Sequence, residues 1–468
     1  MEAFSLNIEL NDLKKYNHIH LIGIGGISMS AIAETLKNWK FTVTGSDSTE
    51  SDITKKLNMH GIKTTIGHDI ENSKKADLII YSAAIPETDP EIQIAKENSI
   101  PLIGRGEFVG YLTKLYNEAI CISGTHGKTT TTSMISICFI NAKKDPTIEV
   151  GALLNKIDGN YRVGNSEYFI LESCEYKANF LKFFPNTAII LNIDNDHLDY
   201  YKTFENIIKT FKEFALLVEN NGLVITNADD KNCFALKDIV KSKFISYGIE
   251  NEKSDFIAKN ISFDNNGFPE FEVYKNQKYF TKIKLSVAGK HNIYNALACI
   301  SVCDYYGIPK EIICSSLKEF TGASRRLEFK GNLNGNISIF DDYAHHPTEI
   351  VATANAIKNK KYNKSWVIFQ PHTYSRTNSL LDDFSEALMN FDNIILLDIY
   401  AARETNTLGI SSKDLAQKIS SKGKEVIYIP DFNEVVEFIK KNSKPNDIII
   451  TLGAGTVTNI GPMLLEKK

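Results

Sequence analysis

Short apolar runs that end in turn residues recur along the first part of the chain. Four of them lie at 18–26, 40–47, 76–86 and 119–127. Stretches of helical length separate them, as at 28–39. Apolar runs of this length between turn signals are typical of buried strands, and their alternation with helices predicts parallel sheets covered by helices on both faces.

The same alternation returns in the last third of the chain, so a middle block lies between two flanking ones. The late apolar runs lie at 365–370, 393–400, 425–430 and 447–455. Glycine-containing segments separate the three blocks and place boundaries near residues 106 and 323. We therefore predict an α/β protein of three domains, which span 1–106, 107–323 and 324–468.

The middle block contains one stretch with a different pattern. Residues 251–284 alternate apolar and polar positions around the turn-like DNNGFP segment. Strict alternation on both sides of a turn is the pattern of half-buried antiparallel strands. We expect an antiparallel addition to the sheet of the middle domain.

Composition and charge exclude several classes of protein. Of the 468 residues, 43% are hydrophobic and 24% are charged, which rules out a disordered or fibrous chain. The 53 Lys and Arg residues nearly balance the 57 Asp and Glu residues, so neither nucleic acid nor an anionic membrane is an expected partner. Any phosphate must therefore be bound by a local motif rather than by the overall charge of the chain.

No sequence signal points to a membrane or to export. The N-terminus resembles neither a signal peptide nor a transit peptide, and no apolar stretch approaches the about 20 residues that span a bilayer. The seven cysteines form no disulfide-like pattern, and we expect Cys299 and Cys303 to be small core residues rather than metal ligands. A cytoplasmic location is expected.

The strongest local motif is SGTHGKTTTT at 123–132, between an apolar strand and an apolar helix. A glycine-rich turn at this point lets backbone N–H groups and the helix N-terminus face a polyphosphate. Lys128 would neutralise the β/γ charge, and the Thr129 hydroxyl could ligate Mg²⁺. The motif is GxxGKT, shorter than GxxxxGK[ST], because Ile122 lies five positions before Gly127.

Acidic side chains follow the next two predicted strands. Glu172 ends the first of these strands, and Glu175 follows it as a second candidate metal ligand. The later strand leads into Asp194, Asp196, His197 and Asp199. Because the carboxyl ends of parallel strands meet at one edge of a sheet, these groups are expected beside the phosphate loop. One carboxylate and the Thr129 hydroxyl would suffice to hold Mg²⁺.

A second glycine-rich loop, GIGGISMS at 23–30, follows the first strand, and Asp47 ends the next strand 22 residues after Gly25. This pattern predicts close approach to a pyrophosphate and a carboxylate for a ribose hydroxyl. Ser28 occupies the third glycine position of the nicotinamide-dinucleotide motif. An NAD-dependent dehydrogenase stays an alternative, although it leaves the 123–132 loop and the third block unexplained.

Several motifs together resemble the Mur ligases. In the middle block they are GTHGKTTTTSM, NIDNDHLD, GKHNIYNALA at 289–298 and FTGASRRLE at 320–328. GIGGISMS, with DDYAHHPTE at 341–349, FQPHTYSRT at 369–377 and DIYAARE at 398–404, extends the resemblance over nearly the whole chain. It implies a Rossmann-like UDP-sugar domain, a central ATP-binding domain of P-loop ATPase type with a mixed sheet, and a Rossmann-like domain for the amino acid.

The resemblance also implies a reaction. ATP would convert the carboxylate of UDP-N-acetylmuramate to an acyl phosphate, which L-alanine would attack to give ADP and phosphate in peptidoglycan synthesis. Mg²⁺ is the implied metal, with Mn²⁺ as an alternative, and no oligomeric state is implied. A recycling ligase that joins a murein tripeptide to the same sugar nucleotide stays open, as does a nucleotide-binding module without catalysis.

Residue roles implied by the resemblance fall into groups. The catalytic group is Lys128, His197 and Arg326. The ATP-binding group is Gly124, Thr125, His126, Gly127, Lys128, Thr129, Thr130, His291, Asn295, Arg326 and Asp342. The UDP-sugar group is Gly23, Gly25, Gly26, Ser28, Met29, Ser30 and Asp47. The amino-acid group is Tyr343, His345, His372 and Arg376, and the metal group is Thr129, Glu172 and His197.

Overall fold

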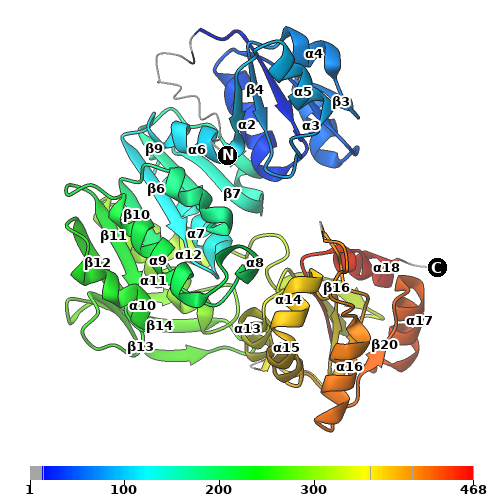
Figure 1. The fold of residues 1–468 in the computed structure, drawn as a ribbon. Helices are drawn as coiled ribbons and strands as arrows, with labels where there is room; N and C mark the ends of the chain where they lie inside the picture. Colours follow the sequence, from blue (N-terminus) through cyan, green and yellow to red (C-terminus); the bar gives the residue numbers. More distant parts are fainter. Residues whose placement is uncertain (1–12, 14, 359, 403, 467–468) are drawn as a thin grey trace.

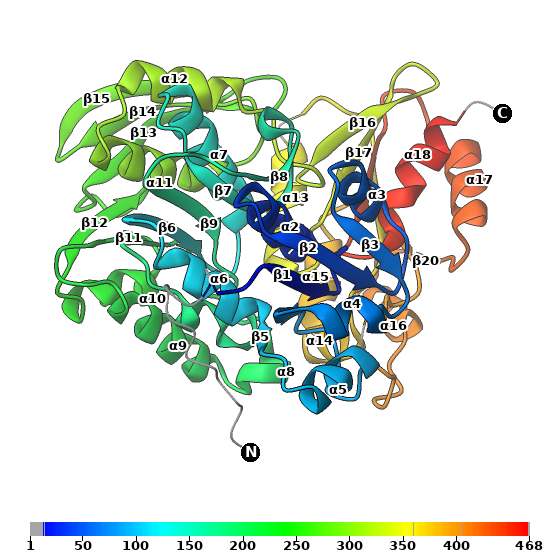
Figure 2. The same ribbon diagram turned by 90° about the horizontal axis from the view of Figure 1, so that it is seen from above.

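The computed structural model describes residues 13, 15–358, 360–402 and 404–466, and it contains three sheets in three separate parts of the chain (Figure 1). Each sheet is covered by helices, which confirms the predicted α/β architecture of three domains. Seen from above, the N-terminal domain lies over the other two, with helix α2 close to strands β7 and β8 of the central domain (Figure 2).

The N-terminal domain is a parallel sheet of order β3-β2-β1-β4-β5. Its strands are β1 (His18–Ile22), β2 (Thr42–Asp47), β3 (Lys63–Ile66), β4 (Leu78–Tyr81) and β5 (Leu102–Gly104). Its helices are α2 (Ile27–Asn38), α3 (Asp52–Met59), α4 (Ile70–Lys75) and α5 (Pro90–Glu97). Strands β1 and β4 are almost entirely buried because helices cover both faces.

The central domain is built on a ten-stranded mixed sheet of order β15-β14-β13-β12-β11-β10-β6-β9-β7-β8. Its strands are β6 (Glu118–Ser123), β7 (Thr147–Leu154), β8 (Gly159–Arg162), β9 (Tyr168–Glu172), β10 (Thr187–Ile190), β11 (Leu223–Asn227), β12 (Lys243–Gly248), β13 (Phe256–Phe263), β14 (Pro269–Lys275) and β15 (Lys278–Lys284). Strands β13, β14 and β15 pair antiparallel, which confirms the addition predicted for 251–284.

Helices surround the central sheet. They are α6 (Arg105–Thr113), α7 (Lys128–Asn141), α8 (Leu198–Tyr201), α9 (Phe204–Leu216), α10 (Lys231–Phe234), α11 (His291–Tyr305) and α12 (Lys310–Glu319), with the 3-10 turns η1 (Asn155–Ile157), η2 (Tyr176–Lys182) and η3 (Ala235–Asp238). Helix α6 packs against η2, so the predicted boundary near residue 106 falls within a helix that contacts the central domain.

The C-terminal domain has a six-stranded sheet of order β16-β17-β21-β18-β19-β20. Its strands are β16 (Glu328–Leu333), β17 (Ile337–Asp342), β18 (Ser365–Phe369), β19 (Asn393–Leu396), β20 (Ile427–Tyr428) and β21 (Ile448–Leu452). Its helices are α13 (Pro347–Lys358), α14 (Tyr374–Ser379), α15 (Leu381–Leu388), α16 (Ser412–Ser421), α17 (Phe432–Asn442) and α18 (Ile460–Leu465), with η4 (Thr456–Asn459). All strands are parallel except β16, which pairs antiparallel with β17 at the edge.

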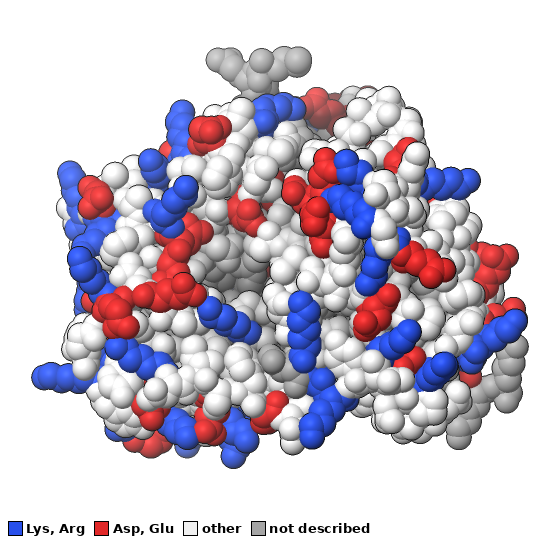
Figure 3. Space-filling view, turned by 90° about the horizontal axis from the view of Figure 1, so that it is seen from below, with Lys and Arg blue, Asp and Glu red and all other residues white. Residues whose placement is uncertain are grey.

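Charged side chains of both signs are interspersed over the face seen from below (Figure 3). This distribution agrees with the small net charge of −4. None of the described helices is long and apolar enough to cross a bilayer.

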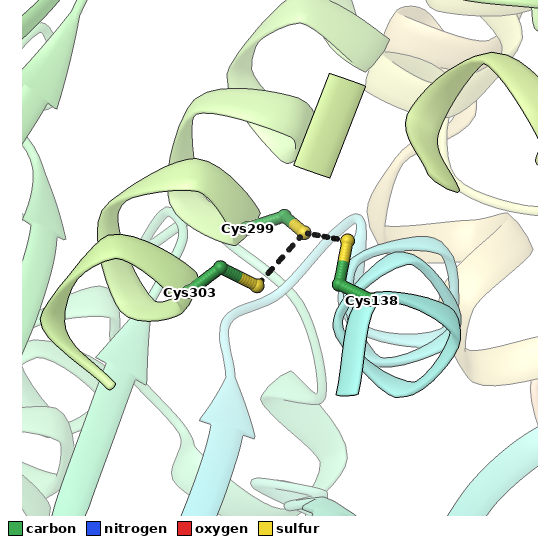
Figure 4. A group of neighbouring side chains, drawn as sticks. All are labelled: Cys138, Cys299 and Cys303. Atoms are coloured by element: carbon green, nitrogen blue, oxygen red, sulfur yellow. Dashed lines mark hydrogen bonds between the residues drawn. The ribbon is translucent and has the colours of Figure 1, made fainter. Parts of the chain in front are cut away.

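Three cysteines meet in the core of the central domain (Figure 4). Cys138 of α7 lies with its Sγ 3.7 Å from that of Cys299, and Cys303, one turn further along α11, lies 3.8 Å from Cys299. All three side chains are fully buried, as expected for core residues. Burial raises the pKa of the Cys299 and Cys303 thiols, so both are neutral at pH 7.

Candidate active site

The phosphate loop joins β6 to α7, and two of its glycines have a backbone that only glycine adopts easily. Gly124 has φ 141° and Gly127 has φ 85°. A Cβ on Gly124 would lie 3.0 Å from the Leu191 side chain, and one on Gly127 would lie 2.5 Å from Asn295 Oδ1. The loop therefore needs glycine at both positions, and its residues open into the N-terminus of α7.

The Lys128 ammonium is enclosed by its own loop. It donates to the backbone carbonyls of Gly124 and Thr125, and it lies 2.8 Å from Glu175 Oε2. Burial alone would raise the pKa of Glu175, but the Lys128 ammonium and the neighbouring His197 lower it, so the carboxylate is charged. In this state Lys128 is held at the loop by a buried ion pair.

Oxygen donors suited to a divalent cation lie beside the loop. The Thr129 hydroxyl donates to Glu172 Oε1 at 3.0 Å, and Arg326 Nη2 donates to the Thr129 hydroxyl at 3.3 Å. His197 Nε2 lies 3.6 Å from Glu175 Oε1. The structure thus brings Thr129 and Glu172 together, whereas Glu175, the second candidate metal ligand, is the counter-ion of Lys128. A carboxylate and a hydroxyl are the hard donors that Mg²⁺ prefers.

A cavity of about 1090 Å³ lies between the central and C-terminal domains, next to the phosphate loop. Seven residues of the predicted ATP-binding group line it: His126, Gly127, Thr130, His291, Asn295, Arg326 and Asp342. Its walls thus include the phosphate loop, the start of α11, the 191–194 segment after β10 and parts of the C-terminal domain.

Burial shifts the pKa of two side chains of the predicted ATP-binding group that line this cavity. Desolvation, helped by the nearby Arg326 charge, lowers the pKa of His291 to about 4, so this imidazole is neutral at pH 7. Burial raises the pKa of Asp342 to about 6, although its carboxylate accepts hydrogen bonds from the Thr353 hydroxyl and the Ala344 N–H. Helix α11 also places Asn295 next to the loop, where its Oδ1 accepts a hydrogen bond from the Thr131 hydroxyl.

Glu349 of α13 is a site residue that the sequence reasoning did not single out. Its carboxylate lies 3.4 Å from His126 Nδ1, 3.4 Å from His345 Nδ1 and 3.9 Å from Arg326 Nη1. The available signal was its position at the end of the DDYAHHPTE motif. Because α13 belongs to the C-terminal domain, this carboxylate joins two domains at the larger cavity.

His126 makes the complementary contact from the central domain. Its Nε2 lies 2.9 Å from Asp194 Oδ2, and the same Asp194 oxygen accepts a hydrogen bond from the Thr348 hydroxyl of the C-terminal domain. Burial would lower the pKa of His126, but the carboxylates of Asp194 and Glu349 raise it to about 9. The imidazole is therefore protonated at pH 7 and is paired with two carboxylates.

A second cavity of about 560 Å³ is lined in part by residues 195–198, which directly follow Asp194 of the larger cavity. All four residues of the predicted amino-acid group line it, namely Tyr343, His345, His372 and Arg376, and so does His197. Arg376 Nη2 donates to Asp196 Oδ1 at 2.8 Å. Burial is the main cause that lowers the pKa of His345 to about 3, so this imidazole is also neutral.

The predicted UDP-sugar group surrounds the turn between β1 and α2. Asp47 Oδ2 accepts a hydrogen bond from the Gly25 N–H at 2.8 Å, and Gly23 has φ 81°. The Ser28 hydroxyl donates to Glu149 of β7 and accepts from Arg105 Nη1. The remaining members lie at the start of the helix: Gly26 caps α2, and Met29 and Ser30 are buried in its first turn. This group lines neither of the two cavities.

Comparison with known proteins identifies the family to which the chain belongs. Three family models match successive parts of the chain. Residues 18–117 match the Mur ligase family catalytic domain, 122–303 the Mur ligase middle domain, and 325–455 the Mur ligase glutamate ligase domain. The chain therefore belongs to the Mur ligase family.

Individual relatives within this family are similar to the chain over nearly its whole length. The UDP-N-acetylmuramate–L-alanine ligase of Acetivibrio thermocellus is 47% identical over 98% of both chains, and that of Clostridium novyi is 49% identical over 98% of this chain and all of its own. A crystal structure of the UDP-N-acetylmuramate–alanine ligase of Thermotoga maritima superposes with a TM-score of 0.80 at 29% identity, over 96% of this chain and 98% of that one.

Proposed function

We propose that the chain is an ATP-dependent ligase that joins L-alanine to the carboxylate of UDP-N-acetylmuramate and releases ADP and phosphate. Near-full-length relatives of almost one-half identity that carry this activity in their names support the assignment. The reaction forms a C–N bond and belongs to peptidoglycan synthesis, and we infer that it takes place in the cytoplasm.

One structural observation carries the proposal: the 194–197 segment lies between the two cavities. Asp194 lines the larger cavity, which begins at the phosphate loop, and Asp196 and His197 line the smaller one. A reaction that moves a phosphoryl group to an acid and then an amine to the acyl phosphate needs a nucleotide site and an amine site that adjoin. The arrangement meets this need.

The first step would depend on positioning and on charge. Lys128 would exchange its contact with Glu175 for one with the γ-phosphate, and Arg326 would reach the same oxygens from the C-terminal domain. His291 and Asn295 would contact the adenine, and Asp342 would contact the ribose. Thr129 and Glu172 would hold Mg²⁺, or Mn²⁺ in its place, which supplies charge neutralisation on the phosphates, and His197 would serve a second metal.

The amine would be bound from the other side. Arg376 presents a guanidinium that could bind the carboxylate of L-alanine through a forked pair of hydrogen bonds. In this structure the guanidinium is paired with Asp196, so the amino acid would compete with that carboxylate. Tyr343, His345 and His372 would line the rest of the amine site, and the neutral imidazole of His345 would not repel an ammonium group.

The sugar nucleotide would lie on the N-terminal domain. The Gly23–Gly26 turn and the start of α2 would approach its pyrophosphate, and Asp47 would turn toward a ribose hydroxyl. The domain limits that we propose are 1–106 for the UDP sugar, 107–323 for ATP and 324–468 for the amino acid. Arg326 then lies just after the second limit, where closure of the C-terminal domain would exclude water from the acyl phosphate.

A phosphate-release assay tests the proposal. The full chain is mixed with ATP, Mg²⁺, UDP-N-acetylmuramate and L-alanine, and each component is omitted in turn. We expect release only from the complete mixture. Faster product formation with the murein tripeptide than with L-alanine would assign the recycling reaction instead. No phosphate release from any mixture would favour a nucleotide-binding module without catalysis. Binding of NADH would favour the alternative of an NAD-dependent dehydrogenase.

A further inference from the structure

A group of three ligand-type side chains lies in the N-terminal domain, outside the two cavities. His68 follows β3 in the loop before α4, Asp89 is the N-cap of α5, and Glu91 lies in the first turn of α5. His68 Nδ1 is 3.5 Å from Glu91 Oε1 and 3.6 Å from Asp89 Oδ2. One ligand atom from each residue lies within 4.8 Å of the other two.

Glu91 supplies an unusual feature, which is a buried carboxylate with one oxygen unused. Its side chain is 0% exposed. Oε2 lies 2.8 Å from His20 Nε2 and accepts a hydrogen bond from the Ser73 hydroxyl at 2.7 Å. Oε1 accepts no hydrogen bond from any described residue. Buried polar atoms are nearly always paired, so an orphaned carboxylate oxygen that faces two other ligand atoms calls for a partner.

The same carboxylate is ionised. Burial alone would raise its pKa, but the His20 and Ser73 contacts at Oε2 outweigh burial and lower the pKa of Glu91 to about 2. A group that is charged at neutral pH needs no deprotonation before it binds a cation. Its other oxygen is already fixed by His20 and Ser73, so Oε1 is held in one direction.

Spacing and charge both fit a divalent ion. Zinc binds nitrogen and oxygen ligands at about 2.1 Å, so two ligands of a tetrahedral site lie about 3.4 Å apart. The two separations from His68 match that edge and are too long for good hydrogen bonds. Two carboxylates also balance the charge of a divalent ion, which favours binding at a partly buried position.

We propose that His68, Asp89 and Glu91 bind a divalent cation of the zinc class, with water in the fourth position. The His68 side chain is 52% exposed, so the ion and its water have access from solvent. His20, which is hydrogen-bonded to Glu91 on one side and to the Thr44 hydroxyl on the other, holds the carboxylate in place. The ion would tie the β3–α4 loop to the start of α5.

The thiol cluster of α7 and α11 is a weaker candidate for such an ion. Three thiolates around a divalent ion would leave a net negative charge in an apolar core, and Cys138, Cys299 and Cys303 offer no access from solvent. Of the group formed by His126, Asp194 and His346, the first two line the larger cavity already described.

Zinc binding to the full chain tests the proposal without any substrate. Chelator-treated protein is titrated with ZnCl₂ against a chromophoric chelator, and thermal unfolding is followed with and without the metal. His68→Ala is the variant, because its exposed side chain can be removed without disturbing the core. His60→Ala is the matched control, since His60 is similarly exposed and lies 2.5 Å from one carboxylate, Glu34.

We expect wild type and His60→Ala to bind one more equivalent of zinc than His68→Ala, or to bind it more than about tenfold more tightly. We also expect zinc to raise the unfolding temperature less in His68→Ala than in the control. To separate this site from the nucleotide cavity, both variants are repeated with His126→Gln. Equal zinc stoichiometry and affinity in His68→Ala and His60→Ala would overturn the proposal and leave only a contact between His68 and the two carboxylates.

Discussion

Replacement of Lys128 by methionine should damage folding and catalysis through separate physical effects. The methionine side chain would fill a similar volume without the ammonium. The Glu175 carboxylate would then stay buried without the ammonium, and His197 Nε2 would still lie 3.6 Å from its Oε1. Lys128 is 13% exposed and Glu175 is 4% exposed, so solvent would screen the unpaired charge poorly.

The stability cost can be estimated from this environment. Loss of one partner from a buried ion pair costs roughly 3–5 kcal/mol, because the other charge is left unpaired. Glu175→Gln removes the charge itself, so Lys128→Met with Glu175→Gln should recover most of the lost stability.

Catalysis should not recover in the double variant. Loss of a donor that stabilises developing charge costs about 3 kcal/mol or more, which is at least about a hundredfold in rate. Thermal unfolding and phosphate release are measured for wild type, both single variants and the double variant. A Lys128→Met protein as stable as wild type would refute the assigned ion pair, and an active double variant would refute the role of Lys128 on the γ-phosphate.

Two further predictions concern the contacts of the C-terminal domain. Arg376→Ala should raise the KM for L-alanine far more than the KM for ATP, because the guanidinium lies in the smaller cavity. Steady-state kinetics with each substrate varied in turn measures both constants. An unchanged KM for L-alanine would contradict the proposed role of Arg376. The pKa of His126 is raised from 6.5 to about 9, so its pairing with Asp194 and Glu349 should stabilise the protein fully below pH 6.5 and lose that effect as the pH rises through about 9. His126→Gln should flatten this fall in unfolding temperature, and a fall as steep as in wild type would assign it to another group.

Much of the fold could be predicted because its strands are continuous apolar runs. Strands such as β18 and β21 are buried on both faces and show little else. The β7–β8 hairpin was not predicted, since it lies at the edge of the central sheet with mixed exposure and shows no clear alternation in its sequence. Strand β16 was missed for a similar reason, because it is an edge strand with mixed exposure.

In the candidate site, too, some features could be predicted from the sequence and others could not. The glycines and Thr129 of the phosphate loop could be predicted because local backbone geometry determines which residues fit. The pairing of Lys128 with Glu175 could not, since 47 residues separate them and only the register of β6 and β9 brings them together. The contact of Glu349 with His126 spans 223 residues and two domains, and no local pattern encodes it.

Arg326, Asp342 and Glu349 of the C-terminal domain line the larger cavity, where we propose that ATP binds, so that domain should not be exchangeable as an independent specificity module. In a chimera whose last third comes from a relative that uses another amino acid as substrate, part of the proposed ATP site would also come from that relative. Any engineered recombinant should therefore carry these three side chains along with the new amine pocket, or its defect will emerge first in nucleotide affinity.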